Sequence, residues 1–158
     1  NSALVKGVNR AWDAGLVVVV AAGNNGPRTM SITTPGISRK VITVGCSDDD
    51  REVLVGGNRM VDYSGRGPTA ACICKPDLVA PGCSVVSCSS RADKYTIKSG
   101  TSMSTPIVSG AVALLLERFP DMANKDVKLR LRESSVDIGL PRNQQGWGML
   151  NVEKMIGK

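Results

Sequence analysis

The apolar run from Ile107 to Phe119 constrains the fold more than any other stretch, because its charged residues come only at Glu117 and Arg118. A helix that is apolar on every side has to be buried in a core. The run follows Gly100-Thr101-Ser102-Met103-Ser104-Thr105-Pro106, so we expect the Ser102 hydroxyl at the positive N-terminal end of a buried helix. That position suits a group that develops negative charge, but a small-residue loop that merely caps a core helix has the same sequence.

Composition limits the classes of function. The 158 residues suffice for one domain with a core. The formal net charge is +6, yet the basic residues are scattered and only 3% of residues are aromatic. Nucleic-acid binding, which would need a basic stripe and stacking rings, is therefore not expected. No apolar run reaches transmembrane length, so we expect no membrane partner. The chain begins at Asn1 without a methionine, as expected for a piece of a longer protein.

The odd number of cysteines cannot be fully paired within one chain. They are Cys46, Cys72, Cys74, Cys83 and Cys88. The pair Cys72-x-Cys74 lacks the usual zinc spacing, and the chain has no histidine to complete a mixed site. We expect free thiols in a reducing compartment and no metal site.

The order of the elements predicts an α/β fold. An amphipathic helix from residue 2 or 3 to Ala14-Gly15 precedes a β-branched run, Leu16 to Ala22, whose lack of alternation predicts a strand covered on both faces. That order forms half of a parallel βαβ unit. We expect further strands at 41–46, 78–80, 85–86 and 95–98, a hairpin over 53–61 around Gly-Gly-Asn, and helices over 124–133 and 151–156.

Asn24 stands at the carboxyl end of the first predicted strand, directly after Gly23. Binding sites of open α/β sheets gather at such strand ends. Asn24 offers a neutral amide donor there, although a plain Asn-Gly turn explains the same residues.

Taken together, these motifs resemble the subtilisin-like serine proteases, the subtilases, and within them the bacterial intracellular alkaline type. The matching segments, in the order of the family, are Val20-Ala21-Ala22-Gly23-Asn24, Lys75-Pro76-Asp77-Leu78-Val79-Ala80-Pro81-Gly82, Gly100 to Pro106, and Gly146-Trp147-Gly148-Met149-Leu150-Asn151-Val152. The resemblance implies the carboxyl-terminal half of a three-layer fold, with a mostly parallel sheet flanked by helices and a β-hairpin. Residues 1–158 would be a partial catalytic domain that lacks the upstream Asp and His.

The resemblance implies a serine endopeptidase in which Ser102 is the nucleophile and Asn24 donates to the oxyanion. Substrate-binding residues would be Ala21, Ala22, Gly23, Thr33 and Thr101. The Asp and His of such a triad precede the Ser in the chain, so we expect the isolated chain to be inactive. The alternative is a non-catalytic relative that serves as a binding or regulatory module.

The resemblance also bears on cofactors, partners and location. Asp77 and the carbonyls near Gly36, Ser38 and Val41 correspond to a weak cation site of some subtilases, but Lys75 stands where a second carboxylate would help. We expect no cofactor, with a weakly held Ca²⁺ or monovalent cation beside Asp77 as the alternative. Expected partners are a polypeptide substrate, the upstream half of the domain and a second copy of the fragment. The expected location is cytoplasmic, with secretion as the alternative.

Overall fold

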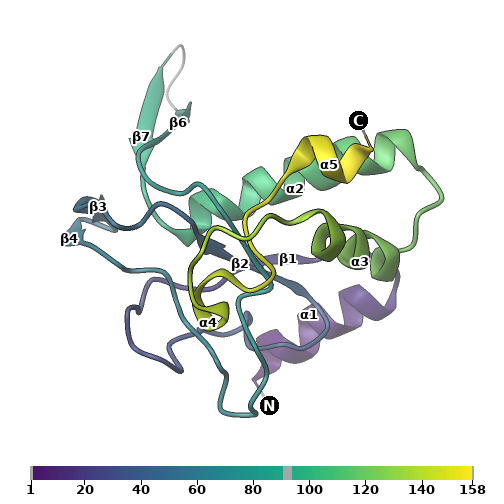
Figure 1. Cartoon of the computed structure of the whole chain (residues 1–158), viewed down its shortest axis with the longest axis horizontal. Helices are drawn as coiled ribbons and strands as arrows, with labels where there is room; N and C mark the ends of the chain where they lie inside the picture. Colours follow the sequence, from purple (N-terminus) through teal and green to yellow (C-terminus); the bar gives the residue numbers. More distant parts are fainter. Residues whose placement is uncertain (1, 91–93, 158) are drawn as a thin grey trace.

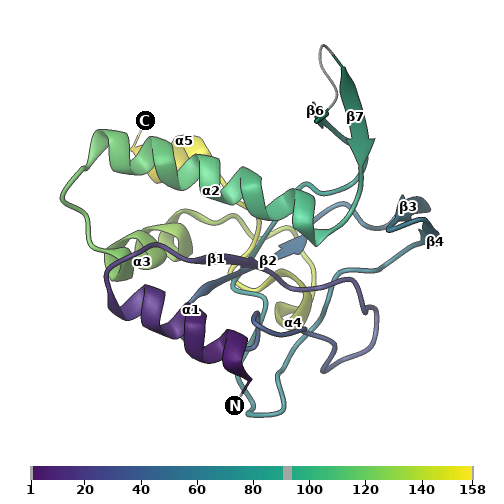
Figure 2. The same cartoon turned by 180° about the vertical axis from the view of Figure 1, so that it is seen from behind.

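A parallel sheet of three strands forms the centre of the computed structural model, which describes residues 2–90 and 94–157. The strands are β1 (Val19–Ala21), β2 (Ile42–Cys46) and β5 (Leu78–Ala80), in the order β1-β2-β5. Helices α1 (Ala3–Asp13) and α2 (Thr101–Arg118) lie on opposite sides of these strands in both views (Figures 1 and 2). The chain therefore has the predicted α/β architecture with a parallel sheet flanked by helices.

Every residue of β2 is buried, because β2 lies between the other two strands. The strand β1 is only half-buried, and Leu16, which precedes it, is 61% exposed. The prediction that Leu16 to Ala22 forms a strand covered on both faces was thus wrong in two respects. The strand is shorter, and it is an edge strand among the described residues.

Helix α2 is buried on one side only, which corrects the prediction of a helix buried all round. Val108, Ala111, Val112 and Leu115 face the core, whereas Leu114 is 50% exposed. The physical reason is that the sheet and α5 (Val152–Ile156) contact α2 from the inner side. Within residues 2–90 and 94–157, no element covers the outer side, where Pro106, Ser109, Gly110, Ala113 and Glu117 are exposed.

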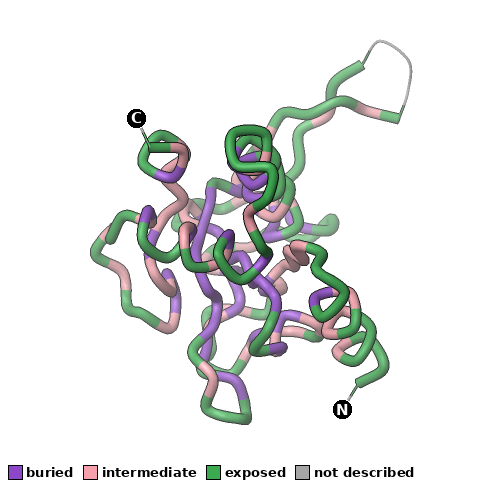
Figure 3. Tube along the Cα trace, turned by 90° about the vertical axis from the view of Figure 1, so that its right-hand side faces the viewer, coloured by how far each residue is buried: buried purple, intermediate pink, exposed green. Residues whose placement is uncertain are grey.

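Two antiparallel pairs project from the sheet. Strands β3 (Val53–Val55) and β4 (Asn58–Met60) form the predicted hairpin, whose turn consists of Gly56 and Gly57, both at positive φ. Strands β6 (Val85–Cys88) and β7 (Tyr95–Lys98) form a second pair that is exposed along most of its length (Figure 3).

The remaining helices close the core. Helix α3 (Asn124–Ser134) directs Val127 and Leu131 inward, as predicted, and the Asn124 amide donates to the Trp12 and Leu16 carbonyls at the end of α1. Helix α4 (Arg142–Gln145) is one turn long, and α5 begins after Asn151, whose side chain accepts from the Lys154 N–H. None of the described helices is long and apolar enough to span a bilayer.

Candidate active site

Ser102 lies in the first turn of α2 and is exposed. Gly100, the residue before this turn, is held in place because its N–H donates to the Gly82 carbonyl at 2.9 Å. Gly100 has φ +139°, and a Cβ added there would lie 3.3 Å from Asn24 Nδ2. Glycine therefore permits both the backbone angle and the close approach of the Asn24 amide to the start of the helix.

The Asn24 side chain is held by Thr101, the residue before Ser102. Asn24 Oδ1 accepts from the Thr101 N–H and from Thr101 Oγ1, both at 3.0 Å. Thr101 Oγ1 in turn accepts from the Gly23 N–H at 3.2 Å. With Oδ1 committed to two donors, Nδ2 is the end of the amide that remains to donate. The end of β1 thus supplies an oriented amide donor at the N-terminus of α2.

The residues predicted to bind substrate lie around this amide. The Thr33 N–H donates to the Ala22 carbonyl at 2.8 Å, and a Cβ on Gly23 would lie 2.2 Å from Thr33 Oγ1. Thr33 is thus packed directly on Gly23, while Ala22 is fully buried and Ala21 is half-buried. Thr101 is also fully buried, so it acts on the site through Asn24.

An open hollow of about 740 Å³ connects Asn24 with Thr33 and is lined by most of residues 24–33 and by Met60. Sequence reasoning missed the contribution of Arg28, Met30 and Met60. No local sequence pattern indicates that these side chains line a hollow. Met60 in particular comes from the hairpin and reaches the hollow only through the tertiary fold.

A model of the subtilase family matches residues 1–148. The chain belongs to the subtilase family. It is 42% identical over 145 residues to the serine protease AprX of Bacillus subtilis (strain 168), covering 84% of this chain and 33% of AprX. It is 34% identical over 155 residues to subtilisin DY of Bacillus licheniformis, covering 97% of this chain and 51% of that protein. This subtilase chain therefore spans about a third to a half of these relatives.

Solved structures agree on the fold. The self-cleaved protease domain of PatA is 25% identical, with a TM-score of 0.73 over 99% of this chain and 54% of that domain. The prenylagaramide maturation protease PagA gives a TM-score of 0.74 at 24% identity, over 96% of this chain and 53% of that structure. The subtilase chain thus folds as the corresponding part of these proteases.

The subtilase chain contains no histidine. No imidazole within residues 1–158 can therefore take the proton of Ser102. A separate charge cluster is centred on Asp77, the residue directly before β5.

Asp77 is buried between two lysines. Its Oδ2 accepts from Lys75 Nζ at 2.5 Å and from the Thr43 N–H at 2.7 Å, while Lys128 Nζ lies 3.5 Å from Oδ1. Burial lowers the pKa of Lys75 to about 8, although the neighbouring Asp77 carboxylate opposes the shift. Lys128 Nζ also donates to the carbonyls of Arg39, Lys40 and Val41 at 2.9 to 3.0 Å. An ammonium group thus contacts the Val41 carbonyl that the family resemblance associates with a cation.

All five cysteines are free thiols, as predicted. Two of them, Cys46 and Cys83, lie on either side of the Tyr63 hydroxyl, each with Sγ at 3.2 Å from it. Burial raises the pKa of the Cys46 thiol, so it stays protonated and donates to Asp48 Oδ1 at 3.1 Å.

Proposed function

We propose that the protein is a serine endopeptidase in which Ser102 Oγ is the nucleophile. The observation that carries this proposal is the pairing of Asn24 with Thr101. It holds an amide donor at the N-terminus of the helix whose first turn contains Ser102. The Oδ1 contact with the Thr101 N–H by itself would serve as a cap, but a cap requires only this acceptor, whereas an oxyanion site also requires the oriented Nδ2 donor.

The residues of this chain supply the nucleophile and the donors that stabilise the oxyanion. When Ser102 Oγ attacks a peptide carbonyl, negative charge develops on the carbonyl oxygen. Asn24 Nδ2 and the Ser102 N–H would donate to that oxygen, and the helix N-terminus adds a favourable dipole. The substrate side chain before the scissile bond would enter the hollow between Asn24 and Thr33.

The proton acceptor comes from outside the chain. Because residues 1–158 contain no histidine, we propose that they form a partial catalytic domain and are inactive alone. The general base and its orienting carboxylate would belong to the part of the relatives that this chain does not span.

The test is active-site labelling of the whole protein with a fluorophosphonate probe, which phosphonylates an activated serine with loss of fluoride. Ser102→Ala should abolish both labelling and peptide hydrolysis. Ser109→Ala is the matched control, because Ser109 is exposed on the same helix and bonds only to the Thr105 carbonyl in the described part. It should leave both readouts unchanged.

Labelling that survives Ser102→Ala would refute the assignment of the nucleophile. A whole protein that neither labels nor hydrolyses peptides would favour the alternative, a binding or regulatory relative. Strong labelling of residues 1–158 alone would refute the proposed inactivity of the fragment.

We further propose a reducing, cytoplasmic location with secretion as the alternative, on the support of the five free thiols. The substrate class is polypeptide, in keeping with the proteases to which the chain is similar. The proposed chemistry requires no cofactor.

A further inference from the structure

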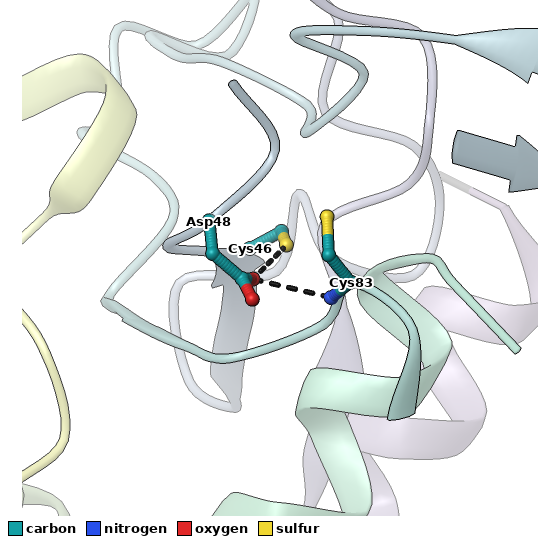
Figure 4. Close-up of side chains that lie close together, drawn as sticks. All are labelled: Cys46, Asp48 and Cys83. Carbon is teal, nitrogen blue, oxygen red and sulfur yellow. Dashed lines mark hydrogen bonds between the residues drawn. The ribbon is translucent and has the colours of Figure 1, made fainter. Parts of the chain in front are cut away.

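Two cysteines and one carboxylate converge behind the Ser102 turn. The Sγ atoms of Cys46 and Cys83 and a carboxylate oxygen of Asp48 all lie within 4.8 Å of one another (Figure 4). Tyr63 OH is 3.2 Å from both sulfur atoms. We propose that Cys46, Cys83 and Asp48 form a binding site for a thiophilic divalent cation of the Zn²⁺ class.

The fold brings these residues together. Strands β2 and β5 pair in parallel with Cys46 opposite Ala80. The chain then turns at Pro81-Gly82 and places Cys83 beside Cys46. The turn is close, because a Cβ on Gly82 would lie 2.8 Å from Cys46 Sγ. Both thiols are therefore positioned by the sheet and by a glycine turn rather than by a flexible loop.

The spacing of the donor atoms suits tetrahedral coordination. Zn–S bonds of about 2.3 Å and Zn–O bonds of about 2.1 Å imply ligand-to-ligand distances of about 3.5 to 3.8 Å. Cys46 Sγ lies 3.1 Å from Asp48 Oδ1 and 3.2 Å from Tyr63 OH. These two separations would have to widen by about half an ångström, the three proposed ligand atoms already lie within 4.8 Å of one another, and a water molecule would be the fourth ligand.

The carboxylate is already oriented for this role. Asp48 Oδ1 accepts from the Gly82 N–H at 2.7 Å and from the Cys83 N–H at 3.1 Å. Such outer hydrogen bonds fix a ligand before the metal arrives. The third donor to this oxygen is the Cys46 thiol, whose proton the metal would replace.

Binding of the cation at this site changes no oxidation state. Two thiols each lose a proton to solvent, both sulfur atoms bind the cation as thiolates, and the carboxylate makes the third bond. Soft thiolate ligands favour Zn²⁺ and Cd²⁺ over Ca²⁺ or Mg²⁺. The site is independent of the proposed peptidase function, although Gly82 connects it to that region through its carbonyl, which accepts from Gly100.

The test is titration of the reduced whole protein with Co²⁺, which gives an intense thiolate-to-metal band when bound to cysteine. We expect the absorbance of the band to saturate at one Co²⁺ per chain, with the intensity of two Co–thiolate bonds. The band should disappear when Zn²⁺ is added and displaces Co²⁺. Cys83→Ser should weaken Co²⁺ binding by at least tenfold. The matched control is the double variant Cys72→Ser/Cys74→Ser, because both of these cysteines are exposed and lie outside the cluster. It should retain the band.

A second measurement needs no variant, since Cys46 is buried and its replacement could prevent folding. Mass-spectrometric mapping of alkylated thiols should show Zn²⁺ protecting Cys83 while Cys72 and Cys88 continue to react. A band of unchanged intensity and unchanged Co²⁺ affinity in Cys83→Ser would overturn the proposal. So would the absence of both the band and the protection in the reduced wild-type protein.

Discussion

At the scale of single residues, the orientation of the Asn24 amide follows from its partner. The Thr101 N–H can only donate, so it requires Asn24 Oδ1 rather than Nδ2 to face it at 3.0 Å. The Thr101 hydroxyl also donates to this oxygen, because an amide oxygen can only accept, and the hydroxyl oxygen accepts from the Gly23 N–H. Three residues from two distant segments thus determine which end of one amide is available to a substrate.

Removing this donor should slow the chemical step. If Asn24 has the proposed role, Asn24→Ala in the whole protein should lower kcat by about 10²–10³, the loss caused by removing an oxyanion-hole amide in subtilisin, with little change in KM. Steady-state kinetics on a chromogenic peptide measures both constants. Asn58→Ala, at an exposed position of β4, is the control and should leave kcat unchanged. An unchanged kcat in Asn24→Ala would exclude the amide from the oxyanion site.

Lys75 should make stability depend on pH. Its pKa is lowered by burial from 10.5 to about 8, so between these values the unfolded chain holds a proton that the folded chain has released. The contribution of Lys75 to the free energy of unfolding therefore rises with pH, by at most about 1.4 kcal/mol per pH unit. Urea unfolding of wild type and Lys75→Met from about pH 7.5 to about pH 10 isolates this contribution as the difference between the two. A difference that falls over this interval would contradict the prediction.

At the scale of elements, hydrogen bonds from Lys128 connect α3 to residues 39–41, which directly precede β2. Its ammonium group donates to three consecutive carbonyls and lies 5.9 Å from the centres of the Trp12 and Trp147 rings. Replacement by Met would remove the donor from the Arg39 and Lys40 carbonyls and the positive charge beside Asp77. The Val41 carbonyl, in contrast, would keep its hydrogen bond from Lys75 Nζ. We expect Lys128→Met to lower the free energy of unfolding by about 2–3 kcal/mol in chemical denaturation. Lys125→Met, exposed near the start of the same helix, should change it by less than about 0.5 kcal/mol.

Addition of Ca²⁺ to the wild-type protein tests whether an ammonium group occupies the place of a cation beside Asp77. Added Ca²⁺ should leave the wild-type unfolding midpoint unchanged, because positive charge already contacts Asp77 and the Val41 carbonyl. A Ca²⁺-dependent rise in the wild-type midpoint would instead support a resident cation beside Asp77.

Element boundaries could be read from the sequence where local signals act, but burial could not. Ser2 and Asn151 accept from backbone N–H groups at the starts of α1 and α5, and the paired glycines form the β3–β4 turn. The predictions for Leu16 to Ala22 and for α2 failed because an apolar residue shows what could be buried, not which neighbour covers it. Ser102 and Asn24 were predicted as site residues through motifs. The cluster of Cys46, Asp48 and Cys83 was not, since only the β2–β5 register brings it together.

At the scale of the whole molecule, the two failed predictions concern neighbouring surfaces. Strand β1 pairs only with β2 within residues 2–90 and 94–157, so its other edge retains unpaired backbone groups. The outer side of α2, which also packs on β1, exposes Leu114 and several small residues. Relatives that are two to three times as long as the matched region have additional chain that could cover both surfaces.

An isolated fragment with an open strand edge beside an apolar helix face should self-associate. We expect sedimentation velocity of residues 1–158 to show species larger than the 16.6 kDa monomer, increasing with concentration. Leu114→Lys should shift the distribution toward monomer, because it places a charge in the centre of the exposed side of α2. Leu54→Lys, at an equally exposed position of the β3–β4 hairpin, should leave the distribution unchanged. A wild-type fragment that stays monomeric at high concentration would show that the surface is stable in water, and the argument for a covering partner would fail.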